Sequence, residues 1–157
     1  MSRIVIAALL GALCAGTAGA ADLSLDLNLA SMHTEAWARR ELNQDNPGLG
    51  LEYQFSPDLS AAGGFYRNSY RRTSAYALGV WTPLHLAIPG GLTASAGLAA
   101  GLVSGYTSTE CPARPLAAGA VLRIRDRDGL GVNLLAVPNT PRGGSGFIGL
   151  QLVVPIC

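Results

Sequence analysis

The 157-residue chain lacks lysine and has little charge of either sign. Only 13% of its residues are charged, against about 25% in an ordinary soluble domain, so a conventional water-facing surface is not expected. Its eleven basic residues are all arginine and stand against ten acidic ones, which excludes a basic nucleic-acid patch and an acidic tail. A hydrophobic content of 49% argues against a disordered chain. The length allows one domain.

Long hydrophobic runs are also missing. Beyond the first twenty residues no stretch reaches the roughly eighteen uninterrupted apolar residues of a membrane-spanning helix. The start of the chain has the order of a secretory signal peptide, with Arg3, an apolar run over Ile4–Leu13 and the cleavage triplet Ala18-Gly19-Ala20. We therefore expect residues 1–20 to be a cleaved signal peptide and residues 21–157 to form a single exported domain.

What the sequence has instead is alternation of apolar with polar or small residues, the period of a β-strand. In the run 23–29, four leucines alternate with Ser24, Asp26 and Asn28. The fourth such run does not show which of its residues share a face. The predicted strands are 23–29, 49–55, 59–68, 73–84, 93–102, 122–125, 131–136 and 148–154.

The connections between these strands alternate in length. The short ones are rich in Pro, Asp and Gly, as tight turns require, and lie at 56–58, 88–91 and 126–129. The longer ones lie at 31–48, 69–72, 106–114 and 139–144. Strict alternation predicts an all-β fold, an eight-stranded antiparallel up-and-down transmembrane β-barrel with short periplasmic turns and longer extracellular loops.

The polar face of the alternation carries few charges and many small residues, so it suits a barrel lumen better than a wetted outer wall. A lumen enclosed by eight strands is narrow enough to be filled by its own side chains. We expect the polar residues to form a salt-bridged network that closes the lumen to ions. The members of this expected network are Asp26, Glu52, Arg123, Arg125, Asn133 and Gln151.

In its strand pattern and loop alternation the whole expected mature chain resembles the small eight-stranded outer-membrane barrels of Gram-negative bacteria. That group includes OmpA-like structural barrels and lipid A-modifying enzymes. The resemblance implies an outer-membrane location, insertion by the barrel-assembly machinery and contact with outer-membrane lipid or lipopolysaccharide. We expect a non-enzymatic surface protein with an envelope-structural or recognition role.

Recognition is expected to lie in the long loops. Thr34 is predicted to cap a short helix that reaches Gln44, with Glu35 and Arg39 one turn apart. Guanidinium groups bind phosphate bidentately, so the loop arginines are candidates for contact with lipopolysaccharide phosphates, with an ordinary solvated rim as the alternative. These arginines are Arg39, Arg40, Arg71 and Arg72.

A second hypothesis is a lipid A acyl-chain hydrolase or acyltransferase. Its base would be His33, its nucleophile a loop serine and its orienting group a loop carboxylate. The candidates are His33, Ser69, Ser74, Glu35 and Asp45. A soluble periplasmic lipocalin-like ligand binder is the third reading.

The remaining cysteines test this topology. Cys111 falls in a long loop and Cys157 at the end of the last strand, so the barrel places them at opposite ends, roughly 25 Å or more apart. We therefore expect no disulfide between them within one molecule, since a disulfide needs Cα atoms within about 7 Å. The Cys and His spacings predict no metal site, and no cofactor is expected. The oligomeric state remains open.

Overall fold

A computed structural model describes residues 23–140 and 144–156 of the chain. The expected signal peptide and Cys157 lie outside the described residues. The elements are β1 (Leu23–His33), α2 (Ala36–Glu41), β2 (Asp45–Gln54), β3 (Leu59–Arg67), β4 (Thr73–Ile88), β5 (Leu92–Val103), β6 (Leu116–Arg125), β7 (Gly131–Val137) and β8 (Phe147–Pro155).

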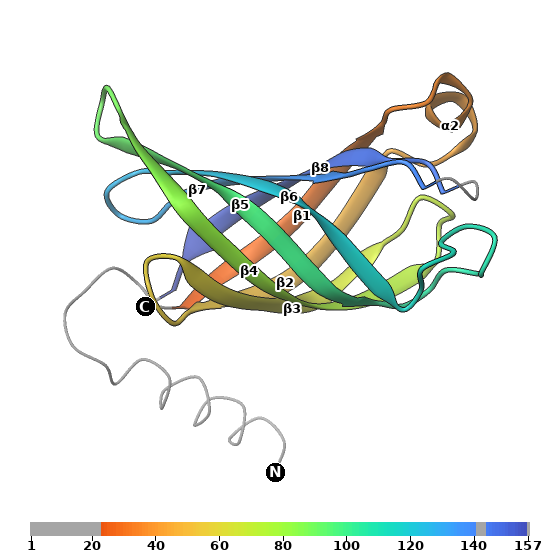
Figure 1. Ribbon diagram of the computed structural model, residues 1–157, viewed down its shortest axis with the longest axis horizontal. Helices are drawn as coiled ribbons and strands as arrows, with labels where there is room; N and C mark the ends of the chain where they lie inside the picture. Colours follow the sequence, from red (N-terminus) through yellow and green to blue (C-terminus); the bar gives the residue numbers. More distant parts are fainter. Residues whose placement is uncertain (1–22, 141–143, 157) are drawn as a thin grey trace, which may run out of the picture.

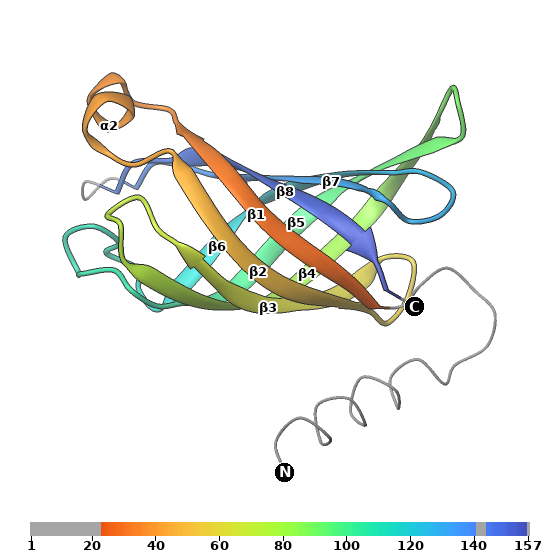
Figure 2. The same ribbon diagram turned by 180° about the vertical axis from the view of Figure 1, so that it is seen from behind.

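Each strand pairs antiparallel with the next, and β8 pairs with β1 to close the barrel (Figure 1). The predicted all-β, eight-stranded antiparallel up-and-down barrel is confirmed. Three connections, 55–58, 89–91 and 126–130, meet at what we call the turn end. The other four form the loop end, where α2 stands above β1 and β2 (Figure 2).

Strand limits differ from those predicted at four places. β1 continues to His33, so residues 31–33 belong to this strand and not to the predicted connection 31–48. β2 begins at Asp45, and β6 begins at Leu116. In β6 the residues before Leu122 are mostly alanine and glycine. The side chains on its two faces are therefore similar in size and polarity, and the sequence shows no two-residue alternation there. β4 continues past Leu84 to Ile88.

The predicted helix cap is wrong. α2 covers only 36–41, and Glu35 occupies the cap position without a side-chain capping bond. The Thr34 hydroxyl instead donates to Asn139 Oδ1 at 2.8 Å, because the chain is still leaving β1 and lies against the connection before β8. The predicted pairing of Glu35 with Arg39 is also absent among the described residues, since Glu35 accepts from the Trp37 indole.

In the hairpin of β4 and β5, β4 extends well beyond its neighbour β3 at the turn end (Figure 1). Pairing of β4 with β3 stops at Trp81, whereas pairing with β5 continues to Ile88. The β4–β5 register shifts between Trp81 and Leu84, around Pro83. This bulge reverses the alternation of faces along β4.

The two faces of the wall differ in chemistry. Large apolar side chains stand exposed on the outside, among them Phe65 and Leu98, each 58% exposed, and Trp81 at 54%. Facing inward, charged and polar residues such as Glu52 and Arg123 are buried. The interior apolar core is small, consisting of Val80, Ala99 and Val121 with Leu78 and Leu135 packed against them.

Candidate functional site

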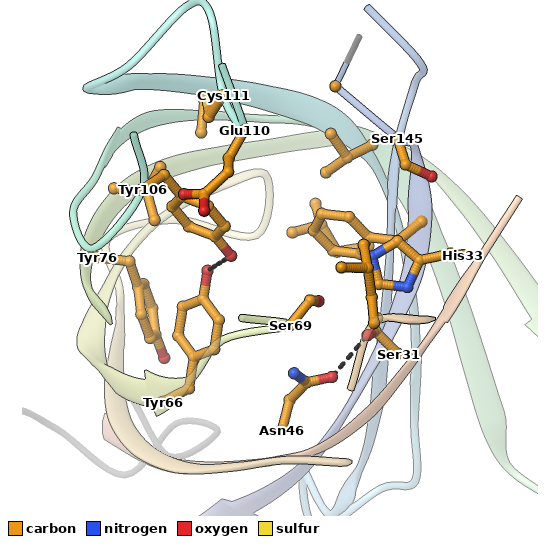
Figure 3. A pocket seen from close by; sticks show the side chains of 18 of the residues that line it. Ser31, His33, Asn46, Tyr66, Ser69, Tyr76, Tyr106, Glu110, Cys111 and Ser145 are labelled. Carbon is orange, nitrogen blue, oxygen red and sulfur yellow. Dashed lines mark hydrogen bonds between the residues drawn. The ribbon is translucent and has the colours of Figure 1, made fainter. Parts of the chain in front are cut away.

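The loop-end half of the lumen is hollow. A cavity of about 370 Å³ opens there, within the range of small-molecule pockets. Its lining is predominantly apolar and aromatic, and all eight strands contribute residues to it (Figure 3). The larger lining side chains include Leu78, Val103, Leu135, Val137, Phe147, Tyr66, Tyr76 and Tyr106.

Three tyrosines give one wall of the cavity its shape. Tyr66 and Tyr106 share a hydroxyl–hydroxyl hydrogen bond of 2.9 Å, and the Tyr66 and Tyr76 rings lie 6.0 Å apart (Figure 3). Burial raises the pKa of Tyr106 above its ordinary value, and Tyr66 adds to the effect. The phenol therefore stays neutral at physiological pH. This wall offers a ligand aromatic faces and neutral hydroxyl groups.

Asn68 fixes the loop beside this wall. Its amide donates to Ser74 Oγ and to the Gly105 carbonyl, and its carbonyl oxygen accepts from the backbone N–H groups of Tyr70 and Arg72. Gly105 has φ +84°, and a side chain there would run into Ser74. The buried asparagine thus joins the loop at 68–72 to the loop at 104–115 and holds the cavity mouth in place.

Arg72 makes a second tie between the same loops. It pairs with Glu110, donates to the Gly105 carbonyl at 3.0 Å and lies over the Tyr70 ring. Burial raises the pKa of Glu110, but hydrogen bonds from Thr107 and Arg72 outweigh it and leave that pKa below its ordinary value. The charges of Arg72 and Glu110 therefore neutralise each other beside the cavity.

His33 stands across the cavity from the tyrosines (Figure 3). It is 3% exposed, its Nδ1 lies 3.2 Å from Gln44 Oε1, and its ring packs near Phe147. Ser69 shares the cavity lining with it. In the described chain no hydrogen bond joins His33 to a serine or a carboxylate.

The other residues of the predicted acyl-transfer set are engaged elsewhere or point away. Ser74 is buried and bonded to Asn68, and Glu35 accepts from Trp37. Asp45 is exposed at the start of β2. The structure brings His33 and Ser69 to one cavity but does not assemble the five candidates into a catalytic unit.

The four loop arginines also separate into two kinds. Arg39 donates to the carbonyls of His33 and Thr34, and Arg72 is held by Glu110. Arg40 and Arg71 are exposed, with no side-chain bond among the described residues. Two guanidinium groups, rather than four, are free to meet an external phosphate.

Below the cavity, polar side chains fill the turn-end half of the lumen. Glu52 pairs with Arg123 and accepts from Ser60 at 2.6 Å, while Arg125 donates to Asn133 at 2.6 Å. The network continues through Gln151, which accepts from Asn133 and donates to Asn28 at the cavity floor. Asp26 is fully buried beside it, without a hydrogen-bond partner in the described chain. We call this group, with Ser60 and Asn28, the lumen plug.

The sequence reasoning missed the tyrosines as lining residues. Tyr66 stands on the polar face of its predicted strand, which is a usable signal. Tyr76 lies in the run whose faces were ambiguous, and Tyr106 comes from a loop. No periodicity could place that loop over the lumen.

No protein-family model matches the chain, and no curated protein matches it in sequence. Within 23–140 and 144–156, no helix is long and apolar enough to cross a membrane. The same ranges contain no cluster of His, Cys, Asp or Glu that could hold a metal ion.

Proposed function

We propose that this protein is an outer-membrane β-barrel that binds a small apolar ligand in its loop-end cavity, as a recognition protein without catalytic activity at that site. The observation that carries the proposal is the cavity itself. It is enclosed by the barrel wall, lined by apolar and aromatic side chains, and shut below by the lumen plug.

The outer wall supports placement in a membrane. Exposed leucine and aromatic side chains on the strands suit lipid, whereas a soluble lipocalin-like barrel needs an outside wetted by charges. Outside the strand ends, the charged residues lie inside the lumen or in connections. The signal peptide expected over residues 1–20 agrees with export. Outer-membrane residence is part of the same proposal.

The lumen plug argues against a conducting pore. Eight strands leave little free lumen, and the ion pair between Glu52 and Arg123 blocks what is left. A molecule that enters the cavity from the loop end therefore meets a floor at Asn28 and Gln151. Entry without passage is the behaviour of a receptor or a carrier rather than a porin.

Lipopolysaccharide is the proposed partner outside the cavity. On the loops at 34–44 and 68–72, Arg40 and Arg71 are exposed and, within the described residues, make no side-chain hydrogen bond or ion pair. Each can hold a phosphate bidentately. The lipid A acyl-chain enzyme built on His33 gains no support from the contacts of His33. Unchanged lipid A in the mass spectrum of a host that expresses the protein is therefore expected.

The membrane location is tested by expressing the full chain in a Gram-negative host. We expect the protein in the outer-membrane fraction, with an electrophoretic mobility that changes on boiling. The same protein in the soluble periplasmic fraction would contradict this part of the proposal and favour the lipocalin-like reading.

The ligand site is tested with a twelve-carbon alkyl diazirine added to the barrel in lipid nanodiscs. After illumination, peptide mapping should find adducts on cavity residues as well as on outward ones. Leu135→Trp fills the cavity from β7 and should reduce the cavity adducts at least about tenfold. Leu134→Trp is the matched control, because neighbouring strand residues point to opposite faces and this tryptophan meets lipid.

Two results would refute the binding proposal. One is a wild-type barrel that carries adducts on outward residues alone. The other is cavity labelling that Leu135→Trp and Leu134→Trp leave equally strong. Both variants must show the boiling-dependent mobility of a folded barrel before they are compared.

A further inference from the structure

A second group of reactive side chains lies at the turn end, outside both the cavity and the lumen plug. His85 of β4 has Nδ1 3.0 Å from Ser95 Oγ on β5. Its Nε2 lies 2.7 Å from Asp58 Oδ1 in the connection between β2 and β3. A serine, a histidine and an aspartate therefore form one continuous hydrogen-bonded chain, drawn from three separate segments.

The fold holds these segments in fixed relation. His85 and Ser95 are direct partners in the β4–β5 register, so their side chains share a face. Asp58 is tied to β4 next to the bulge, because its carbonyl accepts from the Thr82 N–H at 2.8 Å. The overhang of the hairpin carries His85 and Ser95 to the level of the 55–58 turn.

The bulge around Pro83 decides which face they occupy. Ser95 pairs with Arg123 across β5 and β6, and Arg123 points into the lumen. His85 and Ser95 therefore lie on the lumen side of the hairpin. Leu84 and Leu86 take the other side and are exposed. The triad faces the water at the turn-end mouth, and the leucines face away from it.

The hydrogen-bond roles follow from the carboxylate. An ionised Asp58 only accepts, so His85 Nε2 carries the proton that it donates to Asp58. The neutral imidazole then keeps its lone pair on Nδ1, which accepts the Ser95 hydroxyl proton. This is the arrangement of an activated nucleophile, its base and the group that orients the base. The His85 and Asp58 side chains are 37% and 49% exposed, so water and substrate can reach them.

A fourth group lies next to the serine. Arg123 is the cross-strand partner of Ser95, its side chain is 5% exposed, and its Nε–H has no acceptor in the described part of the chain. A buried donor without an acceptor is costly. The oxyanion formed when a serine attacks a carbonyl would supply a charge for this guanidinium to stabilise.

We propose that Ser95, His85 and Asp58 form a catalytic site that hydrolyses short-chain carboxylic esters from the turn-end side. These three residues line neither the loop-end cavity nor the shallow groove beside Leu116, so neither pocket would hold a long acyl chain next to Ser95. This site is independent of the loop-end ligand site, and either can fail without the other.

The reaction balances with water as the only co-reactant. Ser95 Oγ bonds to the acyl carbon while its proton passes to His85 Nδ1. The bond from the acyl carbon to the alcohol oxygen breaks, and His85 returns the proton to the leaving alcohol. Water then attacks the acyl-serine, gives one proton to His85 and releases the carboxylic acid, and Ser95 regains its hydroxyl proton.

The first test needs no variant. The folded wild-type barrel is treated with a fluorophosphonate, which reacts with activated serines, and the adduct is located by peptide mass spectrometry. We expect it on Ser95 and not on Ser56, an exposed serine at the same end. A folded protein without an adduct on Ser95 overturns the proposal. The three side chains would then serve only to hold the hairpin and the 55–58 turn together through hydrogen bonds.

The second test measures hydrolysis of p-nitrophenyl acetate. Ser95→Ala and His85→Ala should each lower the rate at least about a hundredfold, the scale of nucleophile and base removal. Asp58→Asn should lower it less while the adduct still forms. Ser56→Ala should leave it unchanged.

Two outcomes of this assay would contradict the assignment. If Ser95→Ala keeps the wild-type rate, the imidazole acts alone. If His85→Ala keeps it, Ser95 is not activated. The p-nitrophenyl decanoate ester should react more slowly than the acetate. The reverse order would contradict the assignment of short-chain esters as the substrates.

Discussion

The two halves of the lumen are built on the same eight strands and yet differ completely in what they hold. The turn-end half is packed with paired charges and amides, whereas the loop-end half encloses about 370 Å³ of space. The difference lies in side-chain size on the inward face. Long side chains such as Arg123 and Arg125 fill the first half, while Ser31, Ala117 and Gly149 leave the second half open.

This contrast shows what a narrow barrel can vary without changing its fold. Strand number sets the lumen width. Whether a stretch of the lumen is filled by side chains or left as a cavity therefore depends on the size of the inward-facing residues. In the turn-end half, stability depends on satisfying buried charge. In the loop-end half it depends on loops tied to one another above an apolar wall.

The largest expected effect is in the lumen plug. Glu52→Gln leaves Arg123 buried without its counter-charge, and removing one partner of a buried pair costs about 3–5 kcal/mol. Urea unfolding in lipid vesicles, followed by tryptophan fluorescence, should show this loss. Arg67→Met, at an exposed position on β3, is the control. A loss below about 1 kcal/mol would mean that the pair contributes little to holding the turn-end half together.

Replacing both partners sharpens that result. The double variant Glu52→Leu/Arg123→Leu removes the buried charges together, so most of the lost stability should return. If the double variant is as unstable as Glu52→Gln, the ion pair itself is not what the single substitution disturbs.

The next effect is in the loops of the hollow half. Asn68→Ala removes two donated and two accepted hydrogen bonds at a buried position, at a cost of roughly 2–3 kcal/mol. Amide exchange of Tyr70 and Arg72 should become faster while exchange in the strands of the turn-end half stays slow. Asn43→Ala, at a half-exposed position, is the comparison. Uniformly faster exchange would show that the two halves are not separable.

A smaller effect is expected where plug and cavity meet. A Cβ on Gly50 would lie 2.1 Å from the Tyr76 hydroxyl, so Gly50→Ala must push that ring aside at about 1 kcal/mol. Tyr76→Phe in the same chain removes the clashing oxygen and should restore stability. Gly79→Ala, with no contact closer than 3.9 Å, should be neutral. Equal losses in both alanine variants would show that the contact with the Tyr76 hydroxyl is not the cause.

The smallest effect concerns pH at the cavity mouth. The folded-state pKa of Glu110 is lowered, so the stability gained from its ionised form is complete above the ordinary glutamate value of 4.5 and is lost as pH falls through the lower folded value. The effect should stay under about 1 kcal/mol, because Arg72 is partly exposed. In acid, the amides of the loop at 68–72 should lose protection against hydrogen exchange relative to their intrinsic rate at the same pH, and Glu110→Gln should abolish that dependence. An acid response that survives in Glu110→Gln would belong to another group.

The strands were predictable because one face of the wall is uniformly apolar, and a two-residue period survives in the sequence wherever the other face is polar. Alternating link lengths then indicated how the strands connect. The run 73–84 was ambiguous for a physical reason. The bulge after Trp81 reverses its faces, and a one-residue slip moves every later side chain to the other side.

The loop-end cavity and the Ser95–His85–Asp58 group depend on details that the two-residue period of the strands does not predict. The cavity arises from small inward residues on several strands together with Tyr106 from a loop. The Ser95–His85–Asp58 chain requires the exact β4–β5 register and a turn from another hairpin. His33 was chosen because it lies in a long loop region, yet its neighbours turn out to be Gln44 and Phe147.

The extension of β4 beyond β3 also bears on how the protein avoids self-association through its strand edges. A closed barrel leaves no free strand edges, but beyond Trp81 the backbone of β4 has lost β3 as a neighbour. An unpaired edge is a template on which other chains can add strands and aggregate. Pro83, which has no N–H to offer, and the bulge around it stand where that edge begins. The feature that places His85 beside Ser95 also makes the exposed edge irregular and hard to extend.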